Sequence, residues 1–137
     1  MNQCEMLARF AREGDFDCFL LAGRYSLLEQ GALDELFPLC AEKNIGILLG
    51  GTYNSGILAA DLQPGAKYDY ADASPEILTR ARGLQAVAAR HRVSLKAAAS
   101  QFVLAHPVVT AIIPGTRVPD RVSENYQLLE EKIPADF

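Results

Sequence analysis

Hydrophobic residues recur along the chain with two different patterns. In three segments they return at i, i+3, i+4 and i+7, and in two more at i, i+4 and i+7. Both spacings predict amphipathic helices with one buried face. A hydroxyl cap followed by a proline, Ser74-Pro75, is a typical start for one of them. The predicted helices cover residues 3–12, 32–43, 74–90 and 94–106, and a last one begins at Pro119 with Val122, Tyr126 and Leu129 on one face.

Three short apolar runs lie between these helices. Residues 16–22, 45–49 and 108–113 are too short for helices and do not alternate with polar residues, as is typical of strands covered on both faces. Because strands and helices alternate along the chain, we expect a parallel sheet whose strands are joined by helical crossovers. Residues 59–74 are predicted to form a loop that is long for a compact domain.

The composition is typical of a single domain and does not favour binding to polyanions. Half of the 137 residues are hydrophobic, and 13 Lys and Arg against 17 Asp and Glu give a net charge of −4. This balance gives no electrostatic pull toward nucleic acid or an anionic membrane. No stretch approaches the roughly 18 apolar residues of a membrane span, and the first twenty residues lack the apolar core of a signal peptide.

The cysteine pattern predicts neither a disulfide framework nor a zinc site. The chain has three cysteines, an odd number: Cys4, Cys18 and Cys40. They lie far apart in sequence, and none belongs to a C-x-x-C pair. We therefore expect reduced, buried thiols and a cytoplasmic location.

In a parallel α/β fold, ligands bind at the carboxyl ends of the strands, so the turns after the three strands are the candidate sites. The third turn holds Gly115 and leads into a helix that carries Arg121, with Glu124 and Asn125 three and four residues beyond it. Backbone N–H groups at such a helix start attract a phosphate, and the three side chains suit a nucleotide. An ordinary connection with a solvated Arg–Glu pair fits the same spacing.

The other two turns are less specific. Gly50–Gly56 lacks the G-x-G-x-x-G spacing of a Rossmann fold, but its small residues would let a flat or charged ligand approach the backbone. A hydrogen-bonded surface turn explains it equally well. Arg24 and Tyr25, after the first strand, could stack on a ligand ring or simply close the rim of the fold.

The residues give no candidate for metal binding or catalysis. His91 and His106 have no carboxylate or cysteine at ligand spacing, and there is no G-x-S-x-G elbow. Lys67 with Tyr68 and Tyr70 resembles an acid pair, but a long loop is a poor place to hold a tuned proton donor. We assign no catalytic residue and no metal ligand.

The three turns together resemble those of a known family. Residues 112–125 resemble the cofactor-binding signature near the C-terminus of aldo-keto reductases, residues 50–58 the segment after the seventh barrel strand, and Tyr25–Leu28 the end of the sixth. The match runs in order over nearly the whole chain. Within the family, the chain is most similar to the branch that contains D-threo-aldose (L-fucose) 1-dehydrogenase and pyridoxal 4-dehydrogenase.

The resemblance implies a site for NAD(P). Residues 51–55 would lie along the pyrophosphate and ribose, residues 115–117 would meet the adenosine phosphate region, and Asn2 would contact the carboxamide. Arg121 would cover the adenine and any 2′-phosphate, with Glu124 and Asn125 on the adenine. The implied cofactor residues are Asn2, Gly51, Thr52, Tyr53, Asn54, Ser55, Gly115, Thr116, Arg117, Arg121, Glu124 and Asn125.

Two residues depart from the family pattern at the nicotinamide end. Ala22 stands where many members have a carboxamide-binding Gln, and Gly50 stands where many have an aromatic residue that stacks on the nicotinamide.

The length sets a limit on the activity that the resemblance implies. A (β/α)8 TIM barrel needs about 250 residues, so residues 1–137 correspond to a C-terminal half with about three parallel strands and covering helices. The family's catalytic Asp, Tyr, Lys and His belong to the N-terminal half, which would be absent. We expect an oxidoreductase fragment that binds NAD(P), the cofactor that exchanges a hydride with a sugar or another carbonyl or alcohol substrate. By itself, the fragment should have negligible turnover.

The alternative is a non-catalytic nucleotide-binding or interaction module that uses an exposed half-barrel surface. Three strands of an opened barrel would leave an apolar face and two sheet edges bare. We therefore expect self-association or pairing with the missing half.

Overall fold

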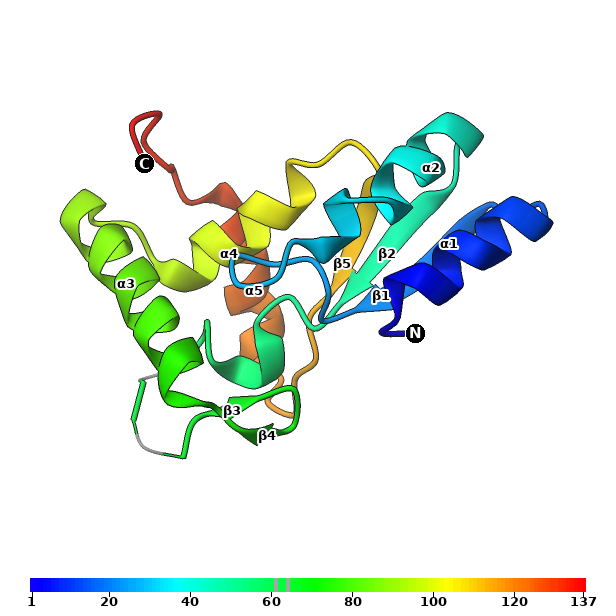
Figure 1. Ribbon diagram of the computed structural model, residues 1–137. Helices are drawn as coiled ribbons and strands as arrows, with labels where there is room; N and C mark the ends of the chain where they lie inside the picture. Colours follow the sequence, from blue (N-terminus) through cyan, green and yellow to red (C-terminus); the bar gives the residue numbers. More distant parts are fainter. Residues whose placement is uncertain (61, 64) are drawn as a thin grey trace.

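The computed structural model describes residues 1–60, 62–63 and 65–137 and folds them into five α-helices, one parallel sheet and a small hairpin (Figure 1). None of the described helices is long and apolar enough to cross a membrane. The elements are α1 (Cys4–Glu13), β1 (Cys18–Ala22), α2 (Leu36–Lys43), β2 (Gly46–Gly50), β3 (Lys67–Tyr68), β4 (Ala71–Asp72), α3 (Pro75–His91), α4 (Leu95–Leu104), β5 (Val109–Ile113) and α5 (Asp120–Glu130), with single 3₁₀ turns at Gly31–Leu33 and Asn54–Gly56.

The parallel sheet confirms the three predicted strands. Its order is β1-β2-β5, with β2 in the centre and parallel to both neighbours. Ala22, Gly50 and Ile113 stand side by side at the carboxyl ends of the three strands. The loops that follow them therefore leave the sheet at one edge, as parallel strands require.

Only one face of this sheet is covered, so the prediction that both faces are buried is wrong. Phe19, Leu21 and Leu49 point into a core formed with α1, α2 and α4. On the opposite face, Leu20 is 47% exposed and Ile113 is 48% exposed. Thr110 is the single polar residue of the three strands, although this second face meets solvent, which explains why their sequence does not alternate.

The last helix also buries less than its pattern predicts. Val122, Tyr126 and Leu129 lie on one face as expected, but all three side chains are exposed. α5 is held from its other side, where Gln101 Nε2 of α4 donates to the carbonyls of Leu128 and Glu131 at 2.8 and 2.7 Å. Its apolar stripe is therefore exposed to solvent.

The predicted helix 32–43 is divided into a 3₁₀ turn and α2. Pro38 explains the division, because its ring would clash with the carbonyl four residues earlier if the helix extended back through Asp34. As the third residue of α2, Pro38 sits in the first turn, where its missing N–H costs no helical bond. The helix therefore begins at Leu36.

The predicted long loop contains the antiparallel hairpin β3–β4. Asp69 and Tyr70 form its turn with φ of 49° and 67°, the left-handed pair that a tight hairpin turn requires. Two-residue strands have no detectable periodicity, and Asp-Tyr is not a typical turn pair, so the sequence did not predict this hairpin. Residues 61 and 64 of the loop lie outside the described residues.

The cysteine prediction is correct for one residue and wrong for another. Cys40, on α2, is buried in the core, and burial raises the pKa of its thiol to about 11. Cys18, in contrast, is exposed on the uncovered face of the sheet.

His106 gives a testable consequence of core packing. Its ring lies 4.7 Å from that of Phe37 and 5.7 Å from that of Tyr25, and Nδ1 accepts a bond from the Val108 N–H at 3.4 Å. Burial lowers the pKa of His106 below its ordinary 6.5. The unfolded chain then binds more protons than the folded one, so stability should fall as pH drops below about 6.5.

Urea unfolding at several pH values between 7.5 and 5 measures this slope. We expect His106→Asn to reduce it, since the amide still accepts a hydrogen bond but does not titrate. His91→Asn, the same change at the other histidine, is the matched control and should leave the slope in place. An unchanged slope in His106→Asn would contradict the assignment.

Candidate functional site

Two adjoining pockets lie where the loops leave the carboxyl ends of β1, β2 and β5. The larger one, here called the cleft, has a volume of about 640 Å³ and runs between the Gly51–Gly56 loop, α4 and α5. The smaller one, here called the rim pocket, has a volume of about 240 Å³ and lies between the start of the chain and the β3–β4 turn. Gly51, Ser55 and Tyr70 line both, so they form one continuous depression.

The structure brings most of the implied cofactor residues together around the cleft. Asn2 and Asn54 lie instead in the rim pocket, and Arg117 is exposed and lines neither. The cleft is lined by nine of the twelve: Gly51, Thr52, Tyr53, Ser55, Gly115, Thr116, Arg121, Glu124 and Asn125.

Gly51 is required where the loops after β1 and β2 cross. Its φ is +68°, and a Cβ on it would lie 2.9 Å from the backbone nitrogen of Gly23. That same nitrogen donates to the carbonyl of Gly50 at 2.9 Å, which fixes the crossing. A side chain at Gly51 would be strained and would also push the two loops apart.

The residues after Gly51 divide between the protein's own network and the cleft. Asn54 is buried, and its amide accepts from Ser26 Oγ and donates to the Gly23 carbonyl at 3.5 Å, so this side chain is used within the fold. Thr52 lines the cleft and is only 1% exposed, yet its Oγ1 has no hydrogen-bond partner within the described part of the chain. A buried hydroxyl without a partner is costly unless a ligand supplies one.

Tyr53 joins two helices behind the cleft. Its hydroxyl lies 2.8 Å from Ser100 Oγ of α4 and donates to Asn125 Oδ1 of α5 at 3.5 Å. Ser100 is buried, so this contact ties the loop to the interior. The loop, α4 and α5 therefore form a connected wall.

Charge on this wall comes from Lys96, Arg121 and Glu124. Lys96 Nζ, on the first turn of α4, donates to Glu124 Oε1 at 2.6 Å and lies 5.9 Å from the centre of the Tyr53 ring. The Lys96 bond, with the charges of Lys96 and Arg121, lowers the pKa of Glu124. Lys96 was not predicted as a site residue, because nothing near it in sequence indicates that the start of α4 faces the turn after β5.

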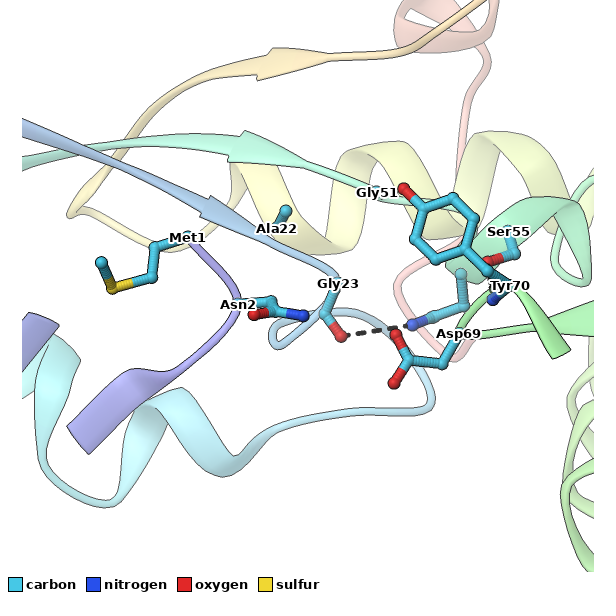
Figure 2. Close-up of a pocket in the computed structure, with 9 residues that line it drawn as sticks. Met1, Asn2, Ala22, Gly23, Gly51, Ser55, Asp69 and Tyr70 are labelled. Atoms are coloured by element: carbon cyan, nitrogen blue, oxygen red, sulfur yellow. Dashed lines mark hydrogen bonds between the residues drawn. The ribbon is translucent and has the colours of Figure 1, made fainter. Parts of the chain in front are cut away.

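An ion pair between Arg24 and Asp69 closes the rim pocket. Figure 2 shows the residues that line this pocket, with Asn2 facing Asp69 and Tyr70 across it. Arg24 Nε donates to the Asn2 carbonyl at 3.1 Å, and its Nη2 bonds Asp69 Oδ2 at 2.9 Å. The Tyr70 N–H donates to Ser55 Oγ at 3.1 Å. Arg24 thus closes the rim and holds the hairpin against the sheet.

The side chains of two other tyrosines and of Lys67 make contacts within the fold. Tyr25 is buried, with its ring 4.8 Å from that of Phe37, so it packs in the core and does not face a ligand. The Tyr68 hydroxyl donates to Glu29, and burial together with this bond raises the pKa of Tyr68 well above its usual value. Lys67 pairs with Asp72 at 2.5 Å.

Comparison with known proteins identifies the family. The model of the aldo/keto reductase family matches residues 2–137, nearly the whole chain. The chain belongs to the aldo/keto reductase family. It is 40% identical to pyridoxal 4-dehydrogenase of Microbacterium luteolum over all of its length, and 36% identical to D-threo-aldose 1-dehydrogenase of a Pseudomonas species over 96% of its length. It spans 40% of the length of each of these aldo/keto reductase relatives.

Solved structures agree on the fold. An aldo-keto reductase of Bacillus halodurans in its apo form superposes with a TM-score of 0.76 at 22% identity, covering 98% of this chain and 45% of that one. The holo form gives a TM-score of 0.75 at 21% identity. The three parallel strands and five helices of this aldo/keto reductase chain therefore have the fold of part of a TIM barrel.

The loop crossing at Gly51 gives a direct test of how the site is built. Gly51→Ala should destabilise the chain by about 2 kcal/mol in urea unfolding, from left-handed backbone strain and the contact with Gly23. Gly115→Ala is the matched control, because a Cβ there meets nothing within 4 Å and the residue also lines the cleft. Equal effects of the two changes would show that the crossing is not constrained.

Proposed function

We propose that this chain is the C-terminal, cofactor-binding part of an aldo/keto reductase and that its cleft takes the adenosine end of NAD(P). The observation that carries the proposal is the gathering of Thr52, from the loop after β2, with Arg121 and the Glu124–Asn125 pair of α5, far apart in sequence, around one cleft. The unpartnered Thr52 Oγ1 supports it independently, since a ligand oxygen would complete its hydrogen bonding.

The lining suits each portion of an adenine dinucleotide. The Gly51–Ser55 backbone would lie along the pyrophosphate, where the small residues permit close approach. The Arg121 guanidinium would pair with an anionic group on the ribose, while the carboxylate and amide of Glu124 and Asn125 would meet the adenine edge or a ribose hydroxyl. Arg117 would have to turn inward to reach the adenosine phosphates, since it is exposed outside the cleft.

The rim pocket would take the nicotinamide end. The Asn2 side chain is available there, because it is the backbone carbonyl of this residue that binds Arg24. Ala22 lines the same pocket and offers no hydrogen bond to a carboxamide, and Gly50 offers no ring to stack on the nicotinamide. We therefore propose that Asn2 and the loop backbone hold this end with fewer side-chain contacts than the family pattern provides.

When bound, the reduced cofactor would supply a hydride to a carbonyl carbon, and the oxidised cofactor would accept one from an alcohol carbon. We assign this chain no catalytic residue. Tyr68, with its raised pKa and its bond to Glu29, is a poor proton donor. The reactions named in the two relatives support a sugar, an aldehyde or another small carbonyl or alcohol as the substrate of the complete protein.

Arg121→Ala tests the cofactor site. Isothermal titration of the full chain should show binding of NADP that weakens by ~1–3 kcal/mol in this variant, since a charge-assisted bond is lost, and binding of NAD that weakens by less. Arg90→Ala, at the far end of α3, is a matched arginine control and should leave both affinities unchanged. Binding of neither nucleotide by the unaltered chain would refute the proposal.

The bare face of the sheet supports a second proposal, that the chain associates through it, either with a second copy or with the other half of a barrel. β1 and β5 are both edge strands, and they carry the exposed apolar side chains of Leu20 and Ile113. Met1 bonds the Leu20 carbonyl and the Ala22 N–H at the end of β1, and no strand pairs with the outer edge of either strand in the described part of the chain. Unpaired edges and exposed apolar residues favour pairing with another chain. An interaction module built on this surface is the alternative function.

Sedimentation measures this association. We expect the purified chain to form dimers or larger species and Leu20→Lys to shift it toward the monomer, because the charge would lie within the contact. Leu33→Lys introduces the same charge at an exposed leucine outside the sheet and should leave the distribution unchanged. A stable monomer over the micromolar range would overturn the second proposal.

A further inference from the structure

Lys96 lies in the cleft but belongs to none of the three segments that carry the family resemblance. It sits in the first turn of α4, and its side chain is only 17% exposed. Its ammonium group is held between the Glu124 carboxylate at 2.6 Å and the face of the Tyr53 ring at 5.9 Å. These contacts keep a lysine, which is usually mobile, against the cleft wall.

The position of Lys96 changes the charge that a ligand meets. The charged side chains that line the cleft in the described part of the chain are Lys96, Arg121 and Glu124, two cations and one carboxylate, so the lining carries a net charge of +1. Without Lys96, Glu124 would face the ligand unneutralised, and the lining charge would fall to zero. Because Lys96 is largely shielded from water, its effect is screened less than that of a surface lysine.

We propose that Lys96 selects the nucleotide, favouring an adenosine that carries a 2′-phosphate over one with a free 2′-hydroxyl. This inference rests on the proposed function of the cleft. A free carboxylate beside the ribose accepts a hydrogen bond from the 2′-hydroxyl, whereas it repels a 2′-phosphate. Because Lys96 bonds to the Glu124 carboxylate, it weakens the hydrogen bond to a 2′-hydroxyl and removes the repulsion of a 2′-phosphate. Arg121 is then left to pair with the phosphate.

Two small probes isolate this end of the cofactor. Adenosine 2′,5′-bisphosphate and 5′-AMP differ only in the 2′-phosphate, so the ratio of their dissociation constants, measured by calorimetry on the full chain, reports the selection. We expect the preference for the bisphosphate to fall about tenfold in Lys96→Met. Lys43→Met, at the end of α2 and outside the cleft, removes the same charge and should leave the ratio unchanged.

A second variant keeps the test independent of any effect of Lys96 on folding. Glu124→Gln removes the carboxylate and frees the ammonium group, so the ratio should move the opposite way, toward the bisphosphate. Lys96→Arg should keep most of the preference, because the charge remains. High salt should reduce the preference of the unaltered chain.

The results that overturn the inference are distinct from those that overturn the proposed function. If Lys96→Met weakens the binding of both probes by the same factor, or if neither variant changes the ratio of their dissociation constants, Lys96 has only a structural role in the cleft wall. If the unaltered chain binds neither probe, the cleft is not a nucleotide site and both proposals fall.

Discussion

The pairing of β2 with both of its neighbours is the constraint on which the candidate site depends. Its two parallel ladders bring Ala22, Gly50 and Ile113 to the same level, so three loops from distant parts of the sequence begin side by side. The crossing at Gly51 then holds two of these loops in contact. A shift of one residue in either ladder would move a loop by the length of a residue and would turn the buried side chains of that strand outward.

Sequence pattern was sufficient to locate the three strands of the parallel sheet but not to predict their environment. The three apolar runs formed strands as predicted, yet the same runs were expected to be covered on both faces, and only one face is. An apolar side chain such as Leu20 has the same sequence signature whether or not another part of a barrel covers it. Burial therefore depended on which neighbours are present, and periodicity contains no information about that.

The site shows a similar limit. Residues adjacent in sequence, such as those of 51–55 or the Glu124–Asn125 pair, could be grouped by resemblance, and the structure gathers most of them in one cleft. Arg117, from the same signature, is outside the lining, and Asn54 is engaged with Ser26. Lys96 enters the cleft only because α4 packs between the sheet and α5, a tertiary arrangement with no local signal.

The exposed thiol of Cys18 gives the uncovered face a chemical reporter of its own. It shares that face with Leu20, whereas Cys40 is buried and its raised pKa leaves almost no thiolate at neutral pH. An alkylating reagent would therefore distinguish the two sites within one molecule. A segment or partner that covers this face of the sheet would slow the labelling of Cys18. The rate of labelling would therefore report when the surface becomes covered, without any engineered tag.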